Sequence, residues 1–316
     1  MPAAPHGLFV GLSTLDVIQR VEQLPGPNAK ATALRQDVAG GGPALNAAVV
    51  FAALGGRATL LTRLGRSGIA RLVRDDLAVH GVEVLDLADD EYVPAVSTVV
   101  VQDDTGDRLV VSTDARGSGT PGRPTESLQG GHIAEPLQQL EGIDVVHLDG
   151  HHADLAMAAA RWGHERADAR VVDAGRWKPV LGELVPFSTD VICSADFAVP
   201  DGCQDPLPWL LGKGVGLAAV TAGAAAVRWA TPSAYGSIEP AAVTVVDTLG
   251  AGDFFHGAYS FARTVRDEGG RTLSPSASLT FAGRVAALKC AQPGTRDWLG
   301  ALAGISPWDD DRGVAR

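Results

Sequence analysis

The chain has 316 residues, of which 46% are hydrophobic and 20% are charged, and its net charge at pH 7 is −11. Such a composition is typical of a globular protein with a large core, and the acidic balance argues against nucleic acid or an anionic membrane surface as a partner. The three cysteines form no Cys-x-x-Cys pair, and we recognise neither a secretory leader nor an apolar run long enough to span a bilayer. We therefore expect a cytoplasmic protein with free thiols.

Short apolar runs alternate with helical patterns along most of the chain, and the alternation predicts a parallel sheet with crossover helices in a single α/β domain, residues 1–316. Strands are predicted at 8–10, 58–62, 96–101, 109–112, 145–148, 170–173, 191–194, 217–221 and 243–246. Helices are predicted at 44–53, 69–80, 154–167, 208–211, 254–268 and 276–290.

Two segments, about 12–37 and 94–112, contain strand and turn patterns without crossover helices between them. We interpret them as a small β-sheet added to the main domain and placed to act as a lid. The segment 116–131 is rich in Gly, Pro, Ser and Thr and is predicted to be a mobile surface loop.

A first glycine cluster, residues 40–42, precedes a helical pattern that carries Asn46 in its first turn. Glycines allow a substrate to approach the backbone closely, and the Asn46 amide can both donate to and accept from a polyol. Equally, the glycines could only form a tight turn and Asn46 only cap the helix. Asp16 follows the first strand, and the carboxyl ends of parallel strands are where α/β proteins bind ligands.

A second polar cluster follows the strand at 145–148 and contains His147, Asp149, His151, His152 and Asp154. These are metal-ligand residue types, so a metal-dependent hydrolase is one hypothesis from a different functional class. The alternative is that alternate residues of a buried strand and its loop are polar by chance. The metal hypothesis also leaves the glycine clusters without a role.

The most informative stretch is the strand-like run 243–246 followed by Gly250-Ala251-Gly252, Asp253 and a helical pattern. A glycine turn at a helix start presents unpaired N–H groups and the positive end of the helix dipole, which suit an anion. Asp253 on that turn could accept a proton from a hydroxyl group beside the anion. A phosphate site with a base is the minimum for phosphoryl transfer, although an acid at this position is often only a helix cap.

Two of these motifs together resemble the PfkB family of ribokinase-like sugar and nucleoside kinases. The stretch Asp247-Thr-Leu-Gly-Ala-Gly-Asp253 resembles the family's C-terminal signature, and Gly41-Gly42-x-x-x-Asn46 resembles its N-terminal sugar-binding signature. Longer stretches, such as Gly-Gly-Gly-Pro-Ala-x-x-Ala-Ala-Val, are most similar to the branch that holds sulfofructose kinase and ketohexokinase. The resemblance implies a ribokinase-like three-layer α/β/α fold with a central, mostly parallel sheet and a small β-sheet lid.

The resemblance also implies a reaction, in which the γ-phosphoryl group of ATP is transferred to a primary hydroxyl of a sugar with Mg²⁺ as cofactor. Asp253 would be the base, and the backbone of Gly250, Ala251 and Gly252 would form the anion hole. The residues implied to bind the sugar are Asp16, Gly41, Gly42, Asn46 and His151. Those implied to bind the nucleotide are Thr221, Gly223, Thr248, Ala282, Ala286 and Cys290. For Ala282, Ala286 and Cys290, plain core packing is an equal alternative.

The chain departs from the family pattern at two places that bear on metal and substrate. The Asn-x-x-Glu pair that often organises Mg²⁺ is replaced by Ser194-Ala-Asp196-Phe197, so the metal ligands are unknown. His151 occupies the position that we align with the arginine reading the sulfonate in sulfofructose kinases. Because imidazole is a weaker anion reader than guanidinium, we favour a neutral ketose or hexose over sulfofructose, a sugar phosphate or a nucleoside.

Three further expectations complete the sequence-based hypothesis. Lid strands commonly pair with another copy, so we expect a homodimer through the lid. Lys289, near the end of the last predicted helix, is expected to be a solvated cation that complements the helix dipole.

A non-catalytic sugar sensor is an alternative function, but such a protein would not need the Asp253 base. The sequence leaves open which sugar and which hydroxyl are used, and whether a monovalent cation activates the enzyme.

Overall fold

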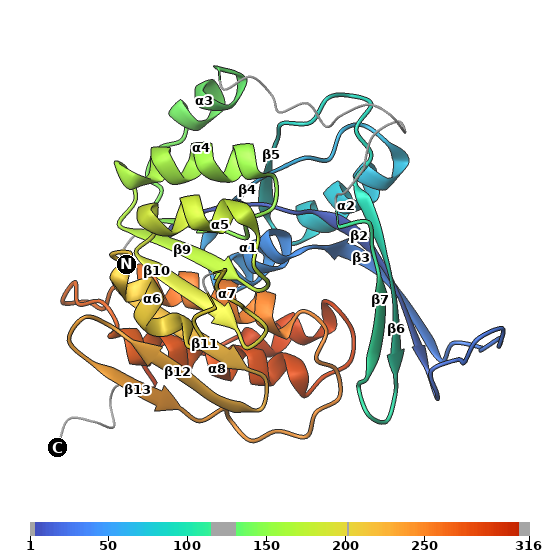
Figure 1. Cartoon of the computed structure of the whole chain (residues 1–316). Helices are drawn as coiled ribbons and strands as arrows, with labels where there is room; N and C mark the ends of the chain where they lie inside the picture. Colours follow the sequence, from blue (N-terminus) through green and yellow to red (C-terminus); the bar gives the residue numbers. More distant parts are fainter. Residues whose placement is uncertain (1–3, 115–130, 201, 310–316) are drawn as a thin grey trace.

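A computed structural model describes residues 4–114, 131–200 and 202–309. At its centre lies a nine-stranded sheet in the order β13-β12-β11-β10-β9-β8-β1-β4-β5, parallel except for β12 and β13 (Figure 1). Its strands are β1 (His6–Val10), β4 (Arg57–Thr62), β5 (Val82–Asp86), β8 (Val145–Leu148), β9 (Ala169–Ala174), β10 (Asp190–Ser194), β11 (Leu217–Ala222), β12 (Ala225–Ala230) and β13 (Tyr235–Ile238).

Helices cover both faces of this sheet and bury two apolar clusters against it. One cluster lies beneath α1 (Pro43–Ala53), α2 (Gly68–Val79), α7 (Ala251–Thr264) and α8 (Pro275–Cys290). The other lies beneath α3 (Gly131–Gln138), α4 (Ala153–His164), α5 (Pro179–Leu184) and α6 (Pro206–Gly212). Strands β1 and β8–β11 are buried on both sides, which explains their continuous apolar sequences. The predicted three-layer α/β/α fold is therefore confirmed.

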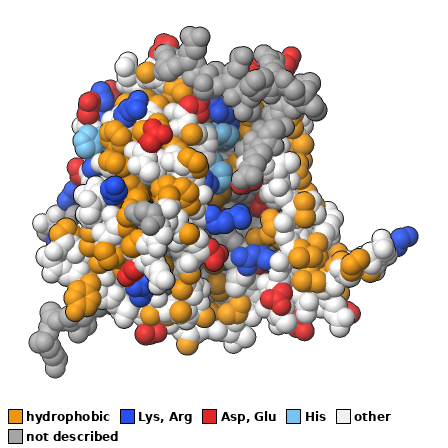
Figure 2. All heavy atoms as spheres, viewed as in Figure 1, with side chains coloured by type: hydrophobic (Ala, Val, Ile, Leu, Met, Phe, Trp, Pro, Cys, Tyr) orange, Lys and Arg blue, Asp and Glu red, His pale blue; other side chains and the backbone are white. Residues whose placement is uncertain are grey.

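A second, four-stranded sheet forms the lid and extends away from the main body (Figure 1). Its order is β3-β2-β6-β7, in which β2 and β6 are parallel and the two outer pairs are antiparallel. The strands are β2 (Thr14–Val21), β3 (Arg35–Gly41), β6 (Ala95–Gln102) and β7 (Arg108–Val111). They come from the two segments predicted for the lid, with β3 running four residues further than expected. Basic and acidic side chains line the hollow between this sheet and the main body, and others are scattered over the rest of the visible face (Figure 2).

The strand predicted at 243–246 is wrong. That segment has no strand partner, and the N–H groups of Val246 and Asp247 instead bond the carbonyl of Cys290 at the end of α8. The chain has left the sheet after β13, and Val243 and Val245 of this apolar run are exposed rather than packed as in a buried strand. The sequence analysis also missed β5, β12, β13, α3 and α5, and it extended α7 four residues too far. The loop predicted at 116–131 lies outside the described residues except for Gly131.

Among the described residues, no helix is both long and apolar enough to cross a membrane.

Candidate active site

The start of α7 has the geometry that the Gly250–Gly252 motif predicts. Gly250 precedes the helix with a positive φ of 73°, a backbone conformation that glycine adopts at no steric cost. A side chain on Gly250 would also approach the Phe254 ring to 3.0 Å, whereas one on Gly252 would meet open space. The first N–H groups of a helix have no partner within it. Here that of Ala251 bonds the Thr248 carbonyl at 3.2 Å, and Gly252 has no side chain to cover its own N–H. This turn can receive an anion.

Asp253 and Asn46 meet at the starts of two helices that pack against each other. The Asn46 amide Nδ2 donates a hydrogen bond of 2.8 Å to Asp253 Oδ2. Burial, together with the nearby carboxylates of Asp173, Asp16 and Asp149, raises the pKa of Asp253 to about 7 against the lowering effect of the Asn46 hydrogen bond. A carboxyl group with a pKa near neutrality can both accept and return a proton under physiological conditions.

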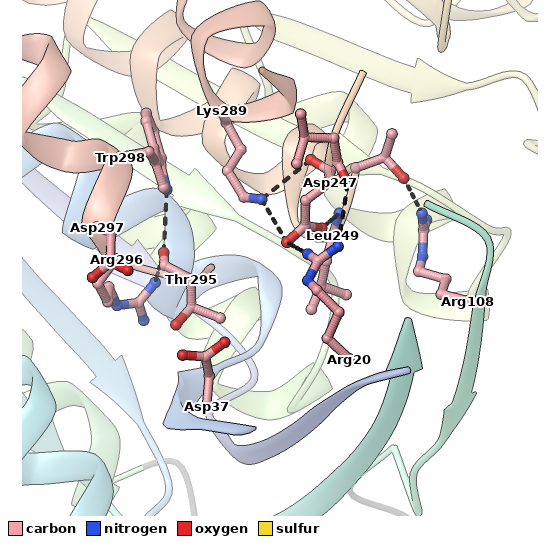
Figure 3. Close-up of polar contacts among 12 residues, drawn as sticks. Arg20, Asp37, Arg108, Asp247, Leu249, Lys289, Thr295, Arg296, Asp297 and Trp298 are labelled. Carbon is pink, nitrogen blue, oxygen red and sulfur yellow. Dashed lines mark hydrogen bonds and ion pairs between the residues drawn. The ribbon is translucent and has the colours of Figure 1, made fainter. Parts of the chain in front are cut away.

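Arg296, which the sequence analysis missed, holds the Asn46 amide in place. Its guanidinium donates to Asn46 Oδ1 at 3.1 Å, to the carbonyl of Gly40 at 2.7 Å and to Asp76 Oδ2 at 3.1 Å. Because guanidinium only donates, the amide oxygen of Asn46 must face Arg296 and its NH₂ group must face Asp253. Arg296 lies in the loop after α8 beside Asp297 (Figure 3), and a single arginine in a loop gives no periodic or spacing signal.

Asp16 lies beside the glycines that precede α1, and the protein itself uses the space that those glycines leave. A side chain on Gly41 would lie 2.1 Å from Asp16 Oδ2, and one on Gly42 would lie 2.3 Å from the carbonyl of Leu12. Burial raises the pKa of Asp16, while the Thr14 hydroxyl donates to its Oδ1 at 2.6 Å. The glycines therefore make room for Asp16 in the site, and a direct approach of the sugar to their backbone stays a prediction.

Asp149, at the end of β8, connects three segments that border the site. Its Oδ2 accepts the N–H groups of Leu12 at 2.9 Å and Ala44 at 3.2 Å, and its Oδ1 accepts that of His151 at 2.8 Å. Burial opposes ionisation, but the His151 imidazolium and the hydrogen bonds hold the pKa of Asp149 well below its usual range. Since Ala44 is in the first turn of α1, Asp149 caps that helix from a distance.

His151 is an ion-pair partner in this arrangement. Its Nδ1 lies 3.2 Å from Asp149 Oδ1 and its Nε2 lies 3.2 Å from Asp114 Oδ1. Burial would lower the pKa of His151, yet the two carboxylates raise it to about 9. His151 is therefore expected to carry a positive charge at neutral pH, and the carboxylates of Asp149 and Asp114 balance that charge.

The predicted nucleotide residues lie on β11 and the turn after it, in the segment before α7, and on α8. Thr221 is the penultimate residue of β11, and Gly223 lies in the following turn with a φ of 59° and open space beside it. The Thr248 hydroxyl accepts a hydrogen bond from Arg108 of the lid. On α8, Ala286 and Cys290 are half-buried, whereas Ala282 is fully buried in the core, as the alternative of core packing expects.

Lys289 is not the solvated cation that its place at the helix end suggested. Its side chain is 1% exposed, and its ammonium bonds the Asp247 carbonyl at 3.2 Å and lies 3.3 Å from Asp247 Oδ2 (Figure 3). Burial lowers the pKa of Lys289. The helical position alone could not reveal a partner that lies 42 residues earlier in the chain.

The described residues contain no group of three or more His, Cys, Asp or Glu side chains arranged to hold a metal ion. Instead, His147 is buried in the core, where its Nδ1 lies 3.4 Å from the Ser260 hydroxyl, and burial lowers its pKa to about 4. Mg²⁺ commonly binds through substrate phosphates, waters and one or two carboxylates, and so it does not need a protein cage. Acidic groups beside an anion-binding turn suit such an ion.

Comparisons with known proteins agree with this geometry. Residues 6–299 match the model of the pfkB family carbohydrate kinases. An ATP-dependent ribose-1-phosphate kinase from Halopiger xanaduensis is 29% identical over 296 residues, which cover 92% of this chain and 93% of the relative.

Solved ribokinases share the fold. The ribokinase of Arabidopsis thaliana, in complex with ribose and ATP, has a TM-score of 0.71 at 22% identity and covers 96% of this chain and 100% of its own. The ribokinase of Giardia lamblia has a TM-score of 0.74 at 14% identity with the same coverage of both chains. The chain belongs to the pfkB family of carbohydrate kinases and is an ATP-dependent sugar kinase.

Proposed function

We propose that Asp253 is the general base that deprotonates a primary hydroxyl of the sugar, and that the Gly250–Gly252 turn binds the transferred phosphoryl group. The observation that carries this proposal is the half-buried Asp253 carboxyl, with its pKa raised to about 7, in the first turn of α7 beside the Gly250–Gly252 backbone. The base and the anion site then lie at the same helix end. An in-line transfer requires this proximity.

The Asp253–Asn46 hydrogen bond indicates which carboxylate oxygen of Asp253 would accept the hydroxyl proton. While Asn46 Nδ2 donates to Asp253 Oδ2, the other carboxylate oxygen is available to a sugar hydroxyl. The hydroxyl proton moves to Asp253 as its oxygen attacks the phosphorus atom, and the helix N–H groups stabilise the charge on the phosphoryl oxygens. Bound Mg²⁺ would neutralise charge on the ATP phosphates, and Asp16 and Asn46 would hold the remaining sugar hydroxyls.

We propose a neutral ketose or hexose as the substrate. Asp16, Asp149 and Asp173 all raise the pKa of Asp253, so the surroundings of the base are acidic and would repel an anionic group. His151, the imidazolium aligned with the family's anion-reading position, already lies between Asp149 and Asp114. Membership of the sulfofructose kinase and ketohexokinase branch stays a prediction from the sequence.

A sugar phosphate is the second candidate, and the ribose-1-phosphate kinase relative is the observation that favours it. If ion pairs at His151 open on binding, its positive charge could face a phosphate. The sugar would still offer a primary hydroxyl to Asp253, so both candidates use the same chemistry.

An ATP-consumption assay separates the two candidates. We expect kcat/KM for fructose, ribose or another neutral sugar to exceed that for fructose 6-phosphate, ribose 1-phosphate and sulfofructose by at least about tenfold, which corresponds to about 1.4 kcal/mol of transition-state binding. Turnover of the anionic sugars alone would contradict the neutral assignment. Nucleosides complete the screen, because they carry the same type of hydroxyl.

We also propose that two copies associate through the lid. Apolar side chains are exposed on and beside the lid sheet, at Leu34, Val38, Leu109, Val110 and Val111. Paired apolar lid faces would remove this surface from water. Light scattering should give the mass of a dimer, and Val38→Glu should give a monomer, whereas Val79→Glu on the exposed face of α2 should not change the mass. A monomeric wild type would contradict the proposal.

A further inference from the structure

A buried charge cluster joins the lid to the segment that leads into the anion-binding turn (Figure 3). Arg20 lies on lid strand β2, and its Nη2 donates to Asp247 Oδ2 at 2.9 Å. Lys289, on α8, approaches the same oxygen at 3.3 Å from the main body. The side chains of Arg20, Asp247 and Lys289 are 6%, 3% and 1% exposed. One carboxylate is therefore shared by two cations from different parts of the fold.

Asp247 also bonds the backbone that leads into the anion-binding turn. Its Oδ1 accepts the N–H group of Leu249 at 2.9 Å, and Leu249 directly precedes Gly250. The Asp247 main chain is fixed as well, because its N–H bonds the Cys290 carbonyl and its carbonyl accepts from Lys289. Each polar group of Asp247 thus has a partner, and a shift of its carboxylate would move the backbone that shapes the anion site.

The lid makes two further contacts with the same segment. Arg108 of β7 donates to the Thr248 hydroxyl, and the Leu249 side chain packs against the lid cluster of Ile18, Val99 and Val101. The turn is therefore held on one side by α8 and on the other by the lid. No local motif in the sequence connects these elements, since Arg20 and Asp247 are 227 residues apart.

We propose that Arg20 and Lys289 are positioning residues that act through Asp247 to hold the anion-binding turn in a fixed position relative to the lid. Neither residue touches the reacting atoms. Removing Arg20 leaves the Asp247 carboxylate paired only with Lys289 of α8, and removing Lys289 leaves it paired only with Arg20 of the lid. Because a buried carboxylate that loses a partner reorganises, the Leu249–Gly252 backbone is expected to move with it. The inference rests on the proposed role of this turn in binding phosphate.

Binding of the ATP analogue AMP-PNP, with Mg²⁺ and without sugar, tests the proposal by calorimetry. We expect Arg20→Met and Lys289→Met each to weaken binding by roughly ten- to a hundredfold, the range expected when binding groups are misplaced by about 1 Å. Arg20→Lys, which keeps the charge, should recover part of the affinity. Since both residues act on Asp247, the double variant should lose less than the product of the two single effects.

Gln19→Ala is the matched control, because Gln19 neighbours Arg20 on β2 but its amide bonds only the exposed Gln36 side chain across the lid. It should bind AMP-PNP like the wild type. A folded Arg20→Met variant with unchanged affinity would overturn the proposal, and if that variant does not fold, unchanged affinity in folded Lys289→Met would do so. Failure of the wild type to bind AMP-PNP would instead contradict the phosphate role of the turn itself.

Discussion

Asp253→Asn is expected to lower kcat by at least about a hundredfold, the typical contribution of a positioned general base. Asparagine keeps the size of the side chain and can still bond Asn46, but it cannot accept the hydroxyl proton. ATP affinity should change little, because the backbone of the Gly250–Gly252 turn is unaltered. Steady-state kinetics of the purified variant measure both quantities. Asp168→Asn, at a side chain that is 84% exposed, is the matched control and should match the wild type.

The pH dependence of kcat/KM gives an independent measure of the same group. With the pKa of Asp253 at about 7, the fraction of ionised base rises with pH, so kcat/KM should increase through neutrality and level off near pH 8. The residual activity of Asp253→Asn should lack this step. Phosphoryl transfer at the wild-type rate by that variant would contradict the assignment, while a wild type that binds sugar without turnover would favour the sensor.

The same pKa predicts that the base reduces stability. The pKa of the Asp253 carboxyl rises from 3.8 in the unfolded chain to about 7 in the folded protein, so the folded protein binds this proton more tightly. The stabilisation that this proton provides is fully present below pH 3.8 and is lost as the pH rises through about 7. Asp253→Asn, which has no charge to bury, should therefore raise the Tm relative to the wild type at pH 8. The gain should be much smaller at pH 5, where Asp253 is also neutral in the folded protein.

Local patterns predicted the parts of the fold that depend on local interactions. The alternation of apolar runs and helical patterns gave the central sheet and most helices, because buried parallel strands and amphipathic helices have distinct periodicities. The strand at 243–246 failed for a non-local reason. A β-branched apolar run has strand propensity, but these residues have no neighbouring strand to pair with and contact the end of α8 instead.

The site shows the same division between local and long-range features. The two glycine motifs are local, so the positions of Gly250, Asp253 and Asn46 could be predicted from spacing. The groups that fix them could not, since Arg296 reaches Asn46 across 250 residues and Asp149 reaches Ala44 across 105. His151 was placed beside the site, but its charge depends on Asp149 and Asp114, and only the folded chain brings both carboxylates to it.

Asp149→Asn is the substitution that we expect to destabilise the fold most. The carboxylate accepts three N–H groups, two of them in fully buried hydrogen bonds, and pairs with His151. A side chain on Gly11 would lie 2.0 Å from it, so the site has no room for rearrangement. The amide has the same shape, but its NH₂ group would face N–H donors and its neutrality would leave His151 underpaired. Breaking a buried pair of this kind costs about 3–5 kcal/mol of unfolding free energy.

The pH window of this loss follows from two opposite shifts. Folding lowers the pKa of Asp149, so the stability that its carboxylate contributes is present above pH 3.8, the pKa in the unfolded chain, and is lost as the pH falls below that value. Folding raises the pKa of His151, so the stability that its imidazolium contributes is fully present below pH 6.5, the pKa in the unfolded chain, and is lost as the pH rises through about 9. The difference in unfolding free energy between wild type and Asp149→Asn should thus be largest between about pH 4 and 6.5.

Urea unfolding at pH 5.5 and 9.5 measures this difference, with Asp168→Asn as the exposed control. An equal loss at both pH values would contradict a role for the ion pair and would assign the effect to the backbone hydrogen bonds alone.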